Sequence, residues 1–151
     1  MKIRVWLFLL TLALTATSTL TAHAKACGNE TIKGSYAATI HGTLFLPDGS
    51  TLLIDGISKA TFDGKGNATG VDAVADNGNL TPGWRPSTGT YSVNPDCTGT
   101  QTVVTPGLPD LHLQFIVAQS GNTIHSVVID PGFATTSDAE RVHAPKHEEG
   151  H

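Results

Sequence analysis

Three histidines lie in segments of alternating apolar and polar residues, where rings from neighbouring strands would meet. His41, His112 and His125 each stand on the polar side of such a segment. Neutral imidazole is the commonest metal ligand in proteins, and three rings would bind zinc with one position left open. The alternative is three unrelated side chains on a solvated surface. Because strand register does not follow from sequence, we take the second interpretation and expect neither a metal nor a cofactor.

Three aspartates fall inside the apolar segments rather than in turns, and they are the candidates for acid–base chemistry. They are Asp55, Asp72 and Asp130. A carboxyl group desolvated inside a barrel would have a raised pKa and would serve as a general base. Asp55 follows Ile54 in the alternation and is expected to face solvent, while Asp130 ends its segment. We expect solvated carboxylates and assign no catalytic residue.

The sequence lacks the usual signatures of nucleophilic and cofactor chemistry. No serine stands in a Gly-x-Ser-x-Gly pattern, and there is no phosphate-binding loop, dinucleotide fingerprint or His-Glu-x-x-His pair. These observations weaken the common enzyme classes. They leave open a cyclase that acts mainly by shaping its substrate.

Aromatic and basic side chains provide the candidates for binding a small molecule. Trp84 and Arg85 stand in a proline- and glycine-rich connection, where a Trp contacts ligands or partners more readily than on a strand. Rings on the strands would line a cavity or fill a core, and core filling is the simpler interpretation. The candidate ligand-binding residues are Tyr36, His41, Trp84, Arg85, Tyr91, Phe115 and His125.

The two cysteines predict one disulfide. Cys27 and Cys97 allow a single intramolecular pairing, which would tie the start of the mature chain to its middle. The alternative is a lipoprotein with an acylated Cys27. The residues before Cys27 argue against acylation, because Lys25 fits a lipidation site badly.

The first 24 residues have the layout of a secretory signal peptide. Lys2 and Arg4 form a short basic region, an apolar stretch follows, and Ala22-His23-Ala24 resembles a cleavage site. The apolar stretch is short for a membrane span, which needs about 20 residues. We therefore predict a signal peptide at 1–24, one domain at 25–143, a disordered polar tail at 144–151, and a periplasmic or extracellular location.

Charge limits the partners. The chain has 9 basic and 13 acidic residues, and two of the basic ones lie in the predicted signal peptide. Without a basic patch, nucleic acid and anionic membrane surfaces are not expected partners. We also expect no integral membrane segment after the signal peptide. A protein partner is left open.

Period-two alternation and turn residues predict an all-β fold. Thr and Val are frequent in the apolar runs, and Gly, Pro, Asn and Asp punctuate them. Successive short strands linked by tight turns favour a closed meander, because closure removes exposed edges. We predict an eight-stranded antiparallel barrel, with a β-sandwich as the alternative. The predicted strands are 34–45, 51–62, 68–74, 87–93, 98–104, 111–118, 123–130 and 139–143.

Three strings carry a resemblance to a known group. They are Gly-Ser-Tyr at 34–36, Phe-Asp-Gly-Lys-Gly-Asn at 62–67 and Gly-Thr-Tyr-Ser-Val-Asn-Pro-Asp-Cys-Thr-Gly-Thr at 89–100. The chain resembles exported bacterial proteins of unknown function that carry these spaced signatures. The resemblance implies an architecture similar to allene oxide cyclase-like or lipocalin-like barrels. Its motifs are turns and strand starts, so it supplies no catalytic residues.

The leading hypothesis for function is an exported barrel that binds a small apolar or amphipathic molecule. Small residues expected to point inward would leave space for such a ligand. An alternative is a cyclase or isomerase acting in the cavity, with His41, His125 or Asp130 as its ionisable group. Another is an envelope or extracellular interaction protein without a small ligand. The small residues expected to point inward are Ala38, Gly42, Gly56, Ala60 and Ala73.

Overall fold

The alternating segments form strands in the computed structural model, which describes residues 26–143. The predicted signal peptide, 1–24, and the predicted tail, 144–151, lie outside the described residues. Two short 3-10 helices, η1 (Asn29–Ile32) and η2 (Gln119–Gly121), accompany nine strands. Within 26–143, no helix is long and apolar enough to cross a membrane.

The strands succeed one another along the chain with short connections. Five of the predicted strands have the predicted start, and four of these also have the predicted end. The strands are β1 (Gly34–Phe45), β2 (Thr51–Phe62), β3 (Asn67–Asp76), β4 (Asn79–Leu80), β5 (Arg85–Val93), β6 (Thr98–Val104), β7 (Leu111–Ala118), β8 (Thr123–Val128) and β9 (Phe133–Arg141).

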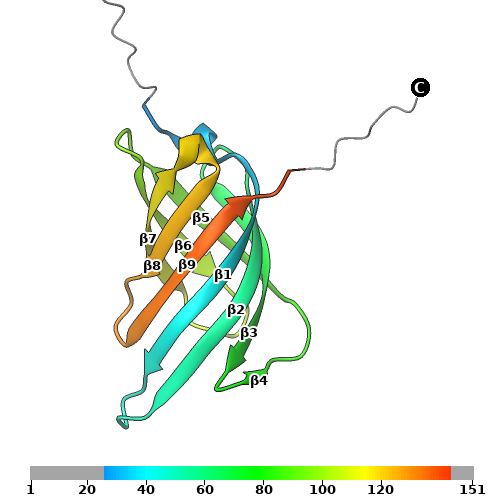
Figure 1. Ribbon diagram of the computed structural model, residues 1–151, viewed down its shortest axis with the longest axis vertical. Helices are drawn as coiled ribbons and strands as arrows, with labels where there is room; N and C mark the ends of the chain where they lie inside the picture. Colours follow the sequence, from blue (N-terminus) through cyan, green and yellow to red (C-terminus); the bar gives the residue numbers. More distant parts are fainter. Residues whose placement is uncertain (1–25, 144–151) are drawn as a thin grey trace, which may run out of the picture.

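Antiparallel pairing closes these strands into a barrel (Figure 1). Each ring strand pairs with the next, β9 pairs with β1, and β4 pairs only with β3 outside the ring. The predicted eight-stranded antiparallel barrel is therefore confirmed, and the β-sandwich alternative is wrong. Closure also leaves no unpaired edge running the length of the sheet.

The last strand was predicted too late and too short. The sequence placed it at 139–143, whereas β9 is Phe133–Arg141. Its first half is rich in Thr and Ser, so it shows little apolar alternation. Pairing with β1 on one side and β8 on the other fixes it as a strand. The two-residue β4 is too short to give a periodic signal.

One end of the barrel is closed by packed aromatic rings. Phe62 lies edge-on between Tyr36 and Tyr91, with ring centroids 5.5 and 4.9 Å apart. Ile32 of η1 is fully buried against these rings. We call η1, with Ile32, the plug. Phe115 reaches over Gly99, where an added Cβ would lie 2.2 Å from the ring. The predicted core role of the strand aromatics is seen at this end.

Covalent and polar links fix the plug to the strands. The predicted disulfide joins Cys27 to Cys97, with their Cα atoms 5.0 Å apart. The Arg141 guanidinium lies 4.8 Å from the centre of the Tyr36 ring and donates hydrogen bonds to the carbonyls of Thr31 and Gly121, at 3.0 and 2.8 Å. The disulfide therefore ties the start of the described segment to the turn before β6, and Arg141 ties its end to η1 and η2.

The hairpin predicted at 63–67 is held by its own first residue. The Asp63 carboxylate accepts hydrogen bonds from the side chain and backbone of Asn67 and from the Lys65 amide. These bonds, led by that from the Asn67 side chain, lower the pKa of Asp63 to about 2. The turn therefore stays intact in mildly acidic solution.

Substitutions at neighbouring positions of β7 test the division between inner and outer faces. Phe115 is 4% exposed and Ile116 is 57% exposed. We expect Phe115→Ala to lower the free energy of unfolding by about 3–5 kcal/mol, because it empties a packed site. The matched control Ile116→Ala should change it by less than about 0.5 kcal/mol. Urea unfolding followed by circular dichroism measures both, and equal effects would contradict this register.

Candidate functional site

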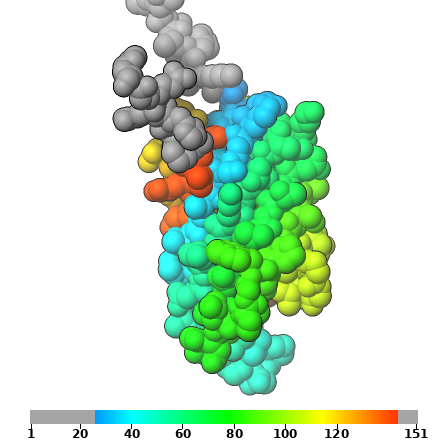
Figure 2. All heavy atoms as spheres, turned by 90° about the vertical axis from the view of Figure 1, so that its right-hand side faces the viewer, coloured from blue at the N-terminus to red at the C-terminus, as the bar shows by residue number. Residues whose placement is uncertain are grey.

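The opposite end of the barrel is hollow. A cavity of about 640 Å³ begins above the packed rings and opens between the connections at the far end of the strands. Figure 2 shows this end from the side, where the turn between β1 and β2 and the segment around β4 extend beyond the body of the molecule. The cavity is therefore closed by the plug at one end and reached from solvent at the other.

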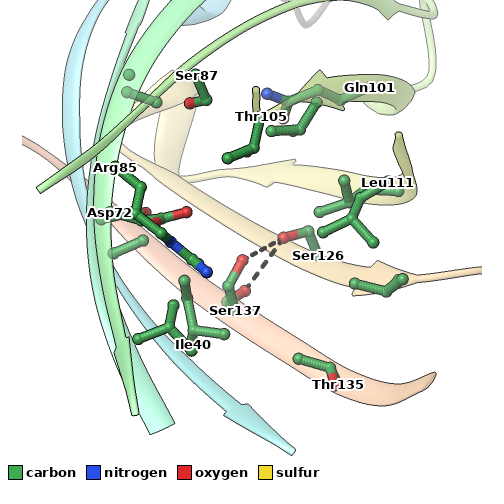
Figure 3. Close-up of a pocket in the computed structure, with 18 of the residues that line it drawn as sticks. Ile40, Asp72, Arg85, Ser87, Gln101, Thr105, Leu111, Ser126, Thr135 and Ser137 are labelled. Atoms are coloured by element: carbon green, nitrogen blue, oxygen red, sulfur yellow. Dashed lines mark hydrogen bonds and ion pairs between the residues drawn. The ribbon is translucent and has the colours of Figure 1, made fainter. Parts of the chain in front are cut away.

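The lining changes in character with depth. The floor is apolar and includes Tyr36, Phe62 and Ile124 from the packed end. Apolar side chains return near the mouth, among them Leu44, Leu52, Ile54, Leu108, Leu111 and Phe133. Between the two lies a set of inward polar side chains, which we call the polar belt: Ser58, Asp72, Arg85, Ser87, Gln101, Ser126, Thr135 and Ser137. Figure 3 labels all of these residues except Ser58.

Small inward residues create the space, largely as predicted. Ala38, Gly56 and Ala60 point inward in the register that pairs β1, β2 and β3. Ala73 was predicted to point inward and does not, because Asp72 and Val74 on either side of it face the cavity. The prediction for Ala73 is wrong by one position along the strand, and a shift of one position moves a side chain to the other face of the sheet.

An ion pair is the strongest polar feature of the belt. Arg85 donates from Nε to Oδ1 of Asp72 at 2.6 Å, across the pairing of β5 with β3. The two side chains are only 26% and 17% exposed. Figure 3 shows the guanidinium extending from this wall toward Ser137 on the other side of the cavity. A charged group and its counter-ion are thus held inside the barrel.

Hydroxyl groups form the facing part of the belt. Ser126 and Ser137 are cross-strand partners on β8 and β9, and their oxygens lie 2.6 Å apart. Thr135 is 5% exposed, and its hydroxyl has no hydrogen-bond partner among the described residues. It lies over Gly42, where an added Cβ would stand 2.7 Å from its oxygen. The belt therefore offers donors and acceptors on both walls.

Carboxylates surround the mouth. Asp76, Asp110 and Asp130 all line the outer part of the cavity. Asp130 accepts hydrogen bonds from the backbone N–H of His112 at 2.7 Å and from its ring Nδ1 at 2.8 Å. These two bonds, the backbone one first, lower the pKa of Asp130 below its ordinary value of 3.8. The mouth therefore carries negative charge at neutral pH.

Of the predicted ligand-binding residues, Tyr36 and Arg85 line the cavity. Tyr91 and Phe115 belong to the packed end below it. The Tyr91 hydroxyl accepts from the Gly64 amide at 2.8 Å, and burial raises the pKa of both tyrosines above 10.0. These phenols are structural hydrogen-bond partners of the plug and its turns. Trp84 is 59% exposed and lies beside the mouth without lining the cavity.

The histidines lie on the outer face and do not converge. His41 pairs with Asp55 across β1 and β2 at 2.9 Å, and His125 pairs with Asp138 across β8 and β9 at 2.6 Å. Both rings are more than half exposed. Between residues 26 and 143 there is no cluster of three or more metal-ligating side chains. The structure does not bring His41, His112 and His125 together.

Sequence reasoning missed most of the belt. It considered Asp72 as an acid–base candidate and expected it to be solvated. It included Arg85 among the ligand-binding residues because of its place beside Trp84, without a partner for it. Ser126 and Ser137 were not singled out. The available signal was the alternation itself, since Asp72 and Ser126 occupy the same phase as apolar residues of their own strands that face inward. Polar residues at inward-facing positions of a strand indicate the wall of a cavity and not a packed core.

Comparisons with protein-family models, curated proteins and solved structures gave no match. The function must therefore be argued from the site itself, because a barrel fold is compatible with many activities.

Titration of Asp130 tests the mouth geometry. We expect its pKa to lie below 3.8 in the folded protein, measured by carbon-13 NMR of the carboxyl group. A lowered pKa adds stability above the unfolded pKa, and this is lost as pH falls through the folded value. His112→Ala should raise the pKa partway, because the backbone bond remains. His125→Ala should leave it unchanged, and a pKa at or above 3.8 in the original protein would contradict the bonding.

Proposed function

We propose that this protein is an exported barrel that binds a small apolar or amphipathic molecule in its cavity. The observation that carries the proposal is the half-filled interior. The cavity of about 640 Å³ falls within the range of about 300–1,000 Å³ that is usual for small-molecule sites. Ile40, Leu44 and Leu113 line it and remain partly exposed, although they point into the barrel. A ligand would cover this apolar surface.

Incomplete packing also distinguishes this function from that of an interaction protein without a ligand. Such a protein needs a filled core for stability, and its binding surface lies outside. Here the fully packed side chains are gathered at the plugged end. The inner wall toward the mouth has no comparable packing, which favours an internal ligand.

Binding is better supported than catalysis. A cyclase or isomerase needs an ionisable group that is free to exchange a proton with the substrate. His41 and His125 face outward, and Asp130 is held by two hydrogen bonds from His112. Asp72 faces the cavity and is bound to Arg85. No specific geometry therefore favours an enzyme.

Two features support the exported location. The N-terminal 24 residues have the composition of a signal peptide, and Cys27 and Cys97 form a disulfide of the kind that persists outside the cytoplasm. The resemblance to exported bacterial barrels agrees with this proposal. Oxidative folding in the periplasm or outside the cell would produce the plugged, open-mouthed form.

Filling the cavity tests the proposed function. Ala38 lines the cavity and its neighbour Ala37 is exposed on the outer face. We expect Ala38→Trp to weaken binding of the fluorescent probe Nile red by about tenfold or more, because the indole occupies the ligand space. Ala37→Trp should leave the affinity unchanged. Fluorescence titration of the oxidised proteins measures both.

Native mass spectrometry of protein purified from a periplasm provides the companion measurement. We expect a mass excess over the oxidised chain that disappears on denaturation and is reduced in Ala38→Trp. Circular dichroism checks that both variants fold. Equal probe affinity for the two tryptophan variants would contradict ligand binding in the barrel.

A further inference from the structure

The position of the polar belt restricts the kind of molecule that the cavity would accept. Apolar side chains lie below the belt at the floor and again above it toward the mouth. A lipid with an anionic head and one apolar tail would place its head either against apolar side chains or beside the mouth carboxylates Asp76, Asp110 and Asp130. The lining instead matches a molecule whose polar group lies between two apolar portions.

The charge of Arg85 is already compensated. Its Nε donates to Asp72 at 2.6 Å in a wall where both side chains are largely buried. A ligand carboxylate placed at the guanidinium would lie beside the Asp72 carboxylate, and like charges at such a distance in a partly desolvated site repel strongly. An anionic group is therefore disfavoured at the belt, although an arginine is present.

Hydrogen-bonding capacity nevertheless remains in the belt. A guanidinium has five N–H donors, and the Asp72 contact uses the one at Nε. On the facing wall the Ser126 and Ser137 hydroxyls lie 2.6 Å apart, and Figure 3 shows Arg85 directed toward this pair. A hydroxyl, ketone or ester oxygen between the two walls would accept from the guanidinium. A hydroxyl would also bond to the serines.

The carboxylates along the route into the cavity also disfavour an anionic ligand. Asp76, Asp110 and Asp130 line its outer part. Two basic residues within 26–143 contribute to the cavity lining, Lys59 and Arg85. Lys59 is exposed in the outward phase of β2, so only Arg85 is in an inward phase. Lys33, Lys65 and Arg141 lie at the plugged end. An anion would thus pass the carboxylates of the mouth before it reached a cation that is already paired.

We infer that the natural ligand is a neutral amphiphile, whose hydroxyl, ketone or ester oxygen binds at the Arg85–Asp72 pair and whose apolar portions fill the floor and the mouth. The barrel discriminates against fatty acids and other anionic amphiphiles. This inference rests on the proposed function, since it names the class of molecule that the cavity takes.

Competition among unbranched ligands of similar chain length tests the inference. Nile red is bound to the oxidised protein near neutral pH, and competitors are then added. Undecan-6-ol and methyl decanoate are the neutral competitors, and decanoate and decylamine are the charged ones. We expect both neutral compounds to displace the probe at concentrations at least about tenfold lower than decanoate. Decylamine should also be weaker than the neutral compounds, because the Arg85–Asp72 pair has no net charge to offset the desolvation of an ammonium group at the belt.

An isosteric substitution identifies the origin of the selection. Asp72→Asn keeps an oxygen that accepts from Arg85 and removes the compensating charge. The affinity for decanoate should then rise about tenfold or more, while that for undecan-6-ol changes little. Asp55→Asn is the matched control, since it makes the same change of net charge on the outer face of β2. It should leave both affinities unchanged.

Two failures are distinguishable. If Nile red binds and is sensitive to Ala38→Trp, but decanoate competes as well as the neutral compounds, the inference is wrong and the proposed function stands. If Nile red does not bind at all, the proposed function fails and the inference with it. Equal gains for decanoate in Asp72→Asn and Asp55→Asn would also overturn the inference, because the selection would then come from overall charge.

Discussion

The cavity exists because nearly all of the tight packing is gathered at one end of the barrel. An eight-stranded ring encloses room for side chains or for one small ligand, so side-chain size decides which it holds. At the plugged end the edge-on rings of Tyr36, Phe62 and Tyr91 pack together in the barrel interior. Toward the mouth Ala38 and Gly56 occupy comparable inward positions. The plug therefore stabilises a barrel whose other half is free to remain open.

The belt is difficult to explain as a source of stability. A partly buried ion pair loses much of its attraction to desolvation, and apolar residues of similar volume often replace such pairs without loss. Asp72 and Arg85 also face open space instead of completing a packed layer. Beside them, the unpaired hydroxyl of Thr135 is a polar group for which the folded chain provides no partner among the described residues. Recognition of a polar group accounts for these features better than folding does.

The alternating sequence predicted most of the fold and little of the site. Strong alternation in 34–45 and 111–118 gave those strands and their inward faces, whereas 133–141 has a polar first half and was recognised only in part. The site depends on register, which decides whether Asp72 meets Arg85 or solvent. Register follows from cross-strand pairing over the whole ring, and no local pattern contains it. For the same reason, the sequence placed His41 and His125 on strands but could not predict that the two rings lie far from each other.

Because the plug and the mouth lie at opposite ends of the barrel, residues at the mouth can change without disturbing the packed core. The connections at the mouth, including the segment with Trp84, contribute no residue to the buried core cluster of the described chain. Changes in such loops are usually tolerated, because the backbone there is exposed and the core lies elsewhere. The disulfide at Cys97 and the anchoring bonds of Arg141 are at the opposite end. Residues of these connections that an entering ligand meets, such as Asp110, are thus able to vary with little cost in stability, while the plug continues to specify the barrel.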